Sequence, residues 1–155
     1  MLAYRKLKGY KYQVAELFHA AVPELLGVTL DEKWFAIRGG ELMVYSGYAW
    51  DGASGPTIDT EATMEAALVH DVLYQCIRAN RLPKESRAIA DAILYRLLRQ
   101  GQQKWAEGHS TALGRTLASV WVETRAMYYF AAVRAFGALA VKPKDLEAQD
   151  IIYTL

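Results

Sequence analysis

Five polar side chains in the middle of the chain have the types and the spacing that hydrolytic chemistry requires. His70 and Asp71 are adjacent, Tyr74 follows one helical turn later, Asp51 precedes them beside a Gly-rich segment, and Asp91 follows in a separate helical segment. An imidazole can take a proton from water, and carboxylates can orient that imidazole or hold a hard cation. The set therefore predicts a hydrolytic site carried by two antiparallel helices.

A tight turn near Arg81 is expected to bring Asp91 beside the His70-Asp71 pair. Two helices joined by a short turn place residues equally far from that turn side by side, and positions 71 and 91 each lie ten residues from position 81 (81−71 and 91−81). His70 and Tyr74 are four positions apart and share one helix face, so both can point at Asp91. Such a carboxylate fixes the imidazole tautomer and makes the imidazole a better base, while Tyr74 donates a second hydrogen bond to it.

A cation site is expected at a neighbouring point beside the first helix. Asp71 is turned by about 100° from His70 around the helix axis, so it addresses a different point in space. Calcium takes about six to eight oxygen ligands, some of them from backbone or water. Asp51 can supply a carboxylate oxygen, and Gly52 or Ala53 a backbone carbonyl. We therefore expect Asp51, Asp71, Gly52 and Ala53 to form a possible calcium site.

The segment before these residues is predicted to be antiparallel β structure. Alternating patterns favour strands at 10–14, 34–38 and 42–48, and the Gly39-Gly40 pair between the last two is a hairpin signal. Segment 15–26 fits either a strand plus turn or a short helix. Residues 51–60 are rich in turn formers and are expected to be a loop that carries part of the site.

The apolar period then changes to a helical one. It predicts a helix from 61 to about 80, a break at Leu82-Pro83, and a second helix from about 84 to 100 with Gly101 as its stop. Segment 105–141 is predicted to be helical with an interruption near 108–114, and 142–155 to be a tail. The fold class is therefore α+β: one domain over 1–155, with a β-rich part at 1–50, a loop at 51–60, an antiparallel helix pair at 61–100, and further helices packed into a bundle.

Composition restricts the classes of partner and compartment. The chain has 155 residues and 53% hydrophobic content, which suits a single core, and its 18 basic and 17 acidic residues leave a formal net charge of +1. We expect no nucleic-acid partner from so balanced a charge. Cys76 is the only cysteine, so an intrachain disulfide cannot form, which suits a reducing compartment or a virus particle assembled in one.

Targeting segments are not predicted. The first residues lead into no long apolar run with a small-residue cleavage site, so no secretory signal peptide is expected. The most apolar late stretch, 126–141, contains Arg134 and is shorter than the roughly 20 residues needed to span a bilayer. No transmembrane helix is therefore predicted.

The order of these motifs resembles the small secreted bacterial and fungal phospholipases A2. The matching residues lie between 50 and 95, and include Asp51-Gly52-Ala53-Ser54, His70-Asp71 with Tyr74, and the distant Asp91; Ala53 and Ala67 stand where that family carries bridging cysteines. The resemblance implies that His70 is the general base, Asp91 its orienting partner and Tyr74 a buried support. It also implies that Asp51 and Asp71 hold calcium, which polarises the ester carbonyl and stabilises the oxyanion.

A second resemblance covers about two thirds of the chain. A strand that enters the loop 51–56, a helix with His70-Asp71-Val72-Leu73-Tyr74 and a helix with Ala90-Asp91 are similar to a family of uncharacterised phage and prophage proteins. This likeness implies a phage origin and a location in the host cytoplasm or the virion. It implies no activity.

Two functions from different classes follow from these observations. The first is a phage-encoded, calcium-dependent ester hydrolase that acts on phospholipid and resembles phospholipase A2. The alternative is a virion or tail-associated structural protein in which the same residues form a non-catalytic polar network. Their partners are, respectively, a phospholipid or membrane surface, and phage structural proteins or a second copy of the chain. The aromatic helical segment within 105–141 fits core or subunit contact, or an interfacial helix.

Overall fold

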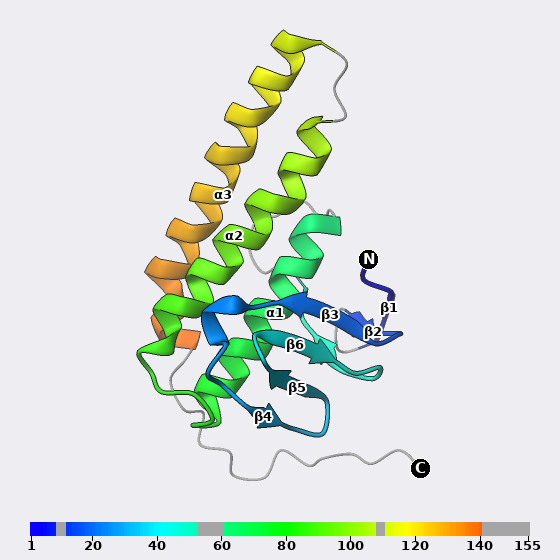
Figure 1. Ribbon diagram of the computed structural model, residues 1–155, viewed down its shortest axis with the longest axis vertical. Coiled ribbons are helices and arrows are strands. Elements are labelled where there is room, and N and C mark those ends of the chain that lie inside the picture. Colours follow the sequence, from blue (N-terminus) through cyan, green and yellow to red (C-terminus); the bar gives the residue numbers. More distant parts are fainter. Residues whose placement is uncertain (9–11, 53–60, 108–110, 141–155) are drawn as a thin grey trace.

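The computed structural model describes residues 1–8, 12–52, 61–107 and 111–140 of the chain. Among these residues, small antiparallel sheets come first and long helices follow, which confirms the α+β class. Figure 1 shows the sheets gathered beside α1 (Glu61–Arg78), while α2 (Ser86–Glu107) and α3 (Ala112–Ala140) form a hairpin that projects beyond them. None of the described helices is both long enough and apolar enough to cross a membrane.

The strands form two sheets, and the chain passes from one to the other and back. The first sheet has the order β1-β2-β7 and the second β3-β6-β5-β4, with every neighbouring pair antiparallel. Their bounds are β1 Tyr4–Lys6, β2 Tyr12–Val14, β3 Phe18–Ala21, β4 Leu30–Asp31, β5 Phe35–Arg38, β6 Glu41–Val44 and β7 Ala49–Trp50. Because β7 pairs with β2, the strand that leads into Asp51 is held against the start of the chain.

The predicted Gly-Gly hairpin is present between β5 and β6. Arg38 pairs with Glu41, and the two glycines between them have φ angles of 57° and 75°. Positive φ at both central positions is the requirement of a two-residue turn that matches the strand twist. The second strand is shorter than predicted, because β6 ends at Val44 and the chain turns through Gly47, which has a φ of 100°. Segment 15–26 becomes β3 followed by a 3-10 helix at Pro23–Leu25.

The first two helices meet at the predicted turn. α1 ends at Arg78, Asn80 adopts a φ of 55°, and the amides of Arg81 and Leu82 donate to the carbonyl of Cys76 at 2.8 and 3.2 Å. Asparagine is one of the residues that tolerates this left-handed conformation after a helix. The predicted stop at Gly101 is wrong, since α2 continues to Glu107. A glycine costs only about 1 kcal/mol inside a helix, and packing against α3 outweighs it.

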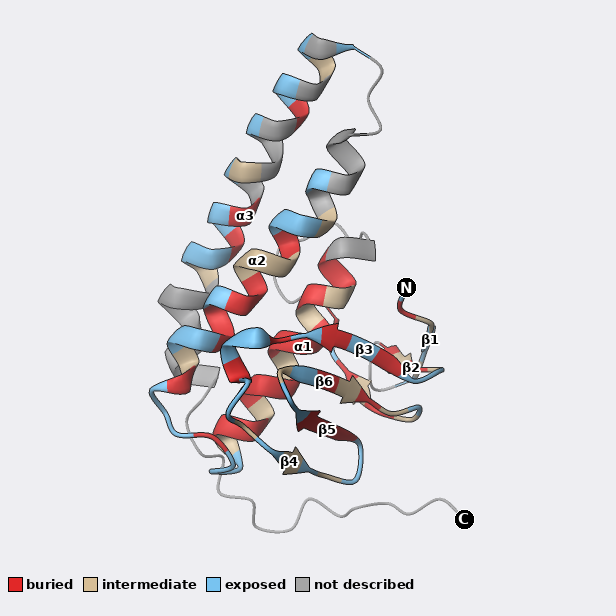
Figure 2. Cartoon of the chain, in the orientation of Figure 1, coloured by how far each residue is buried: buried red, intermediate tan, exposed pale blue. Residues whose placement is uncertain are grey.

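The core lies on both sides of α1. One cluster joins the sheets to α1 and the start of α2, with fully buried Ile37, Leu42, Leu68, Leu73 and Ile93 among its members. A second cluster joins α1 and α2 to α3 and consists of Ala66, Leu94, Leu98, Ala126 and Tyr129. Figure 2 shows α1 as the most continuously buried of the helices. His70 and Tyr74 on α1 are therefore held in the interior of the protein.

Candidate functional site

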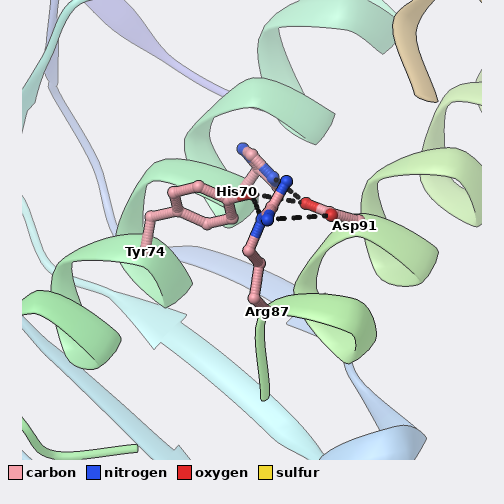
Figure 3. A network of polar contacts seen from close by, with 4 residues as sticks. All are labelled: His70, Tyr74, Arg87 and Asp91. Atoms are coloured by element: carbon pink, nitrogen blue, oxygen red, sulfur yellow. Dashed lines mark hydrogen bonds and ion pairs between the residues drawn. The ribbon is translucent and has the colours of Figure 1, made fainter. Parts of the chain in front are cut away.

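A polar network joins α1 to α2 where their helices pack together. Nε2 of His70 lies 3.0 Å from Oδ1 of Asp91, and the hydroxyl of Tyr74 donates to the same oxygen at 2.7 Å. The rings of His70 and Tyr74 are 4.1 Å apart between centroids, as expected for neighbours on one helix face. Both contacts with Asp91 that the sequence predicts are present (Figure 3).

Arg87 is a fourth member of this network, and the sequence reasoning missed it. Its Nε donates to the Tyr74 hydroxyl at 3.3 Å and lies 3.8 Å from Oδ2 of Asp91. Arg87 precedes Asp91 by four residues on α2, which is the spacing of a helical ion pair. That spacing was the available signal, but it is equally typical of a solvent-exposed pair. Here it places a guanidinium beside a carboxylate that is fully buried.

The network keeps Asp91 charged despite its burial. Burial alone would raise the pKa of Asp91, but hydrogen bonds from His70 and Tyr74, together with the charges of His70 and Arg87, outweigh it and lower that pKa. Burial and the hydrogen bond to Asp91 raise the pKa of Tyr74 to about 12, so Tyr74 remains a hydrogen-bond donor. A buried carboxylate that accepts several hydrogen bonds is thus available as the fixed partner of the imidazole.

The chemistry of its partner assigns the histidine tautomer. An ionised carboxylate can only accept hydrogen bonds, so the His70 nitrogen that faces Asp91 must carry the proton. The other ring nitrogen, Nδ1, then has a lone pair in the neutral imidazole. This is the arrangement of a base whose orientation is set by a carboxylate.

A family comparison places these residues in a known sequence family. A model described as "Protein of unknown function (DUF1353)" matches residues 28–110, which is more than half of the 155-residue chain. The chain belongs to the DUF1353 family. No curated protein and no solved structure matches it.

The DUF1353 segment contains every candidate site residue. It runs from just before β4 to just beyond α2, and so includes Asp51, His70, Asp71, Tyr74 and Asp91. It leaves out β1, β2, β3 and α3. The polar network and the candidate cation site are therefore built within the family's own segment, whereas α3 is an addition outside it.

On the sheet side of α1, the DUF1353 chain brings two carboxylates into electrostatic contact. Burial raises the pKa of Asp71 to about 7, the positive charge of Arg78 opposes this shift, and the negative charge of Asp51 adds to it. Asp71 is half-buried and Asp51 is exposed. Two like charges that share a site in this way favour any cation that can lie between them. Among the described residues of the chain, no cluster of three or more His, Cys, Asp or Glu side chains forms a metal site.

The backbone that carries Asp51 is fixed from both sides. Gly52 is buried with a φ of 79°, and a Cβ atom there would lie 2.5 Å from the Tyr12 ring. Tyr48, just before β7, donates to Oε1 of Gln75 on α1 at 2.8 Å, and burial followed by the charge of Asp71 raises the Tyr48 pKa. The loop therefore starts at a set position against α1. Ala53, the other predicted carbonyl donor, lies outside the described residues.

Proposed function

We propose that this DUF1353 protein is a calcium-dependent ester hydrolase that acts on phospholipid, with a site like that of phospholipase A2. The observation that carries the proposal is the bond between His70 Nε2 and Asp91 Oδ1 at 3.0 Å. It leaves Nδ1 of His70 as the basic nitrogen. The Asp91 charge then stabilises the imidazolium that forms when Nδ1 takes a proton.

The two reactants of the proposed reaction are water and an ester. Nδ1 of His70 takes one proton from water, and the resulting hydroxide oxygen bonds to the ester carbonyl carbon. The carbon–oxygen bond to the alcohol part then breaks, and His70 returns its proton to the leaving alkoxide. The products are a fatty acid and an alcohol. Tyr74 and Arg87 touch Asp91 and not the substrate, so they are positioning residues.

Two carboxylates fit a hard cation beside this base. The charge of Asp51 helps to raise the pKa of Asp71, and Asp51 is exposed, so the pair can supply oxygen ligands while water completes the shell. When bound there, calcium would polarise the ester carbonyl and offset the oxyanion charge. Arg78 already offsets part of the negative charge of Asp71. This positive charge limits how tightly Asp51 and Asp71 can bind a metal. Gly52 lets the backbone pass close to Tyr12 and brings Asp51 to this position.

The setting of the proposed enzyme also follows from the sequence likeness. We include a phage origin, a location in the host cytoplasm or the virion, and a phospholipid or membrane surface as the substrate-bearing partner. These points are supported by the order of the motif residues, which resembles that of phage proteins and that of phospholipases A2. The length of the family match supports only membership of DUF1353.

One observation favours the alternative function. His70 is only 8% exposed, Tyr74 is 3% exposed and Asp91 is fully buried. Buried polar groups must satisfy one another whether or not they are catalytic. In the alternative, His70, Tyr74, Arg87 and Asp91 brace α1 against α2 in a virion or tail-associated structural protein. Under that reading, no substrate reaches Nδ1.

Fatty-acid release from phospholipid vesicles separates these two functions. Wild-type protein, His70→Ala and the control His19→Ala are compared with calcium and with a chelator. His19 is a suitable control because it is exposed, on β3, and paired with Glu41. We expect His70→Ala to lower the calcium-dependent rate by about a hundredfold or more and His19→Ala to leave it unchanged. Equal background release by wild type and His70→Ala would reject the hydrolase.

A further inference from the structure

The positive charge of the chain is concentrated in its first residues. Residues 1–15 include Arg5, Lys6, Lys8 and Lys11 and no acidic residue, whereas residues 16–155 hold 14 basic (18−4) and 17 acidic side chains. The formal net charge of +1 therefore divides into +4 for residues 1–15 and −3 for the rest (14−17). A local concentration of one sign of charge attracts partners of the opposite sign even when the net charge is small.

The cations on and after β1 have no carboxylate partners in the part of the chain that the structure describes. Arg5, Lys6 and Lys8 are all exposed, and Nε of Arg5 donates to Oε1 of Gln13 at 2.9 Å. Gln13 is neutral, so this bond leaves the charge of Arg5 uncompensated. Other arginines pair with carboxylates: Arg38 with Asp31, Arg81 with Glu32, Arg96 with Glu24 and Arg99 with Glu123. The charge at β1 can therefore attract an external anion.

Two exposed apolar side chains lie beside these cations. Tyr4 begins β1 and is 40% exposed, and Leu17, which follows β2, is 53% exposed. The amide of Ala15 donates to the carbonyl of Ala3 at 2.8 Å, which holds the segment before Leu17 against the residue that precedes β1. We call this set the β1 patch: Tyr4, Arg5, Lys6, Lys8 and Leu17.

The β1 patch is open to a large partner. β1 is an edge strand in the order β1-β2-β7, and all three of its residues are exposed. Figure 1 shows β1 on the side of the molecule opposite to α3. Successive side chains of a strand point to opposite faces of its sheet. At an edge, side chains from both faces can reach a surface that lies along the strand.

The mixed composition of the β1 patch fits an anionic phospholipid surface. Lysine and arginine are attracted to anionic headgroups, while tyrosine and aliphatic side chains enter the layer below them. A nucleic acid is bound mainly through its phosphates, and an exposed leucine adds nothing to such contacts. The presence of Leu17 beside the cations therefore favours a lipid surface over a nucleic acid.

We propose that the β1 patch docks the protein on membranes that contain anionic phospholipid. The inference rests on the proposed function, which makes phospholipid the substrate, and it adds the headgroup charge and the contact surface. Lys6 is opposite Tyr12, and Tyr12 is opposite Trp50, the residue before Asp51. Two strand spacings of about 4.8 Å separate Lys6 from Trp50, so docking through β1 brings the start of the Asp51 loop to about 10 Å from the docking strand.

Sedimentation of the full chain with phospholipid vesicles tests the charge of the partner. A chelator is present, so neither hydrolysis nor bridging by calcium contributes. Wild type is expected to bind vesicles of phosphatidylcholine mixed with phosphatidylglycerol, to bind vesicles of phosphatidylcholine alone far more weakly, and to be released by salt. Lys6→Gln with Lys8→Gln should weaken binding to the mixed vesicles by about thirtyfold, which is about fivefold for each lysine.

The control for charge is Lys33→Gln with Lys84→Gln. These two lysines are also exposed, lie outside the β1 patch and change the net charge by the same amount. This control pair should bind like wild type. Urea denaturation of each variant shows whether it remains folded.

A leucine pair tests the apolar part of the patch. Leu17→Ser is expected to weaken binding to the mixed vesicles by about fivefold or more, because part of an aliphatic side chain no longer enters the lipid. Leu26→Ser is the matched control, since Leu26 is 69% exposed but follows the 3-10 helix outside the patch. It should bind like wild type. Equal binding by the two leucine variants would contradict a lipid partner.

Three further outcomes would overturn the inference. They are equal binding of wild type to the two kinds of vesicle, equal losses in the two lysine pairs, and tighter binding of wild type to a short DNA duplex than to the mixed vesicles. Docking is measured without hydrolysis, so the two proposals can fail separately. Vesicle binding without fatty-acid release would reject the hydrolase alone, and fatty-acid release without vesicle binding through the β1 patch would reject the docking surface alone.

Discussion

Nε2 of His70 in α1 and Oδ1 of Asp91 in α2 lie 3.0 Å apart, so a histidine–carboxylate pair joins two helices inside the protein. The same pair must serve both stability and any chemistry at the site. Tyr74 and Arg87 complete its polar surroundings. Substitutions in this network therefore have to be measured for unfolding as well as for activity.

Removing the buried carboxylate should destabilise the protein strongly. Asp91→Ala leaves Arg87 and the His70 and Tyr74 donors without their acceptor, and we expect the free energy of unfolding to fall by about 3–5 kcal/mol. Urea denaturation at pH 7 measures it. The control is Asp31→Ala, which removes the exposed partner of Arg38 and should cost less than about 1 kcal/mol. Equal losses in the two variants would contradict the network.

The Tyr74 hydroxyl should contribute a smaller amount. Tyr74→Phe removes one of two hydrogen bonds to Oδ1 of Asp91 while the ring stays in place, so we expect a loss of about 1–2 kcal/mol in unfolding free energy. Tyr128→Phe is the matched control because Tyr128 is 52% exposed on α3, and it should leave stability unchanged. Thermal and urea unfolding of the two variants decide the point. A neutral Tyr74→Phe would show that this bond adds nothing.

The pKa of Asp71 predicts a pH-dependent stability. Its folded-state pKa of about 7 lies above the ordinary value of 3.8, so the folded protein prefers the protonated side chain. The contribution of Asp71 to stability is then greatest below about pH 4 and is lost as the pH rises towards 7. Asp71→Asn should match wild type at pH 4 and exceed it by about 1–3 kcal/mol at pH 8. A variant that is less stable than wild type at pH 8 would contradict this sign.

At pH 8, calcium should reverse the stability difference between wild type and Asp71→Asn if Asp51 and Asp71 bind it. A ligand that binds only the folded state raises stability with its concentration, so calcium should raise the melting temperature of wild type at pH 8. Asp71→Asn and Asp51→Asn should lose this response. Glu65→Gln, which alters a partly exposed carboxylate elsewhere on α1, should keep it. An equal calcium response in all four proteins would place binding elsewhere.

Regular helix geometry explains why the central contacts could be predicted. Counting from the turn near Arg81 and along one helix face is enough to bring Asp91 to His70 and Tyr74. Arg87 could not be distinguished from a surface ion pair, because burial depends on how α2 packs against α1. β1 was missed because all three of its residues are exposed and it forms only by pairing with β2. Gly101 was misread because the α2–α3 contact is not visible in local sequence.

The rate of fatty-acid release from phospholipid vesicles, followed as calcium is added to wild type and to His70→Gln, tests the central claim most directly. Glutamine keeps a polar side chain next to Asp91 but provides no basic nitrogen, so folding can be retained while the base is lost. The proposed function predicts a calcium-dependent rate for wild type that falls by about a hundredfold or more in His70→Gln. Folded His70→Gln and wild type with the same background rate at every calcium concentration would contradict it.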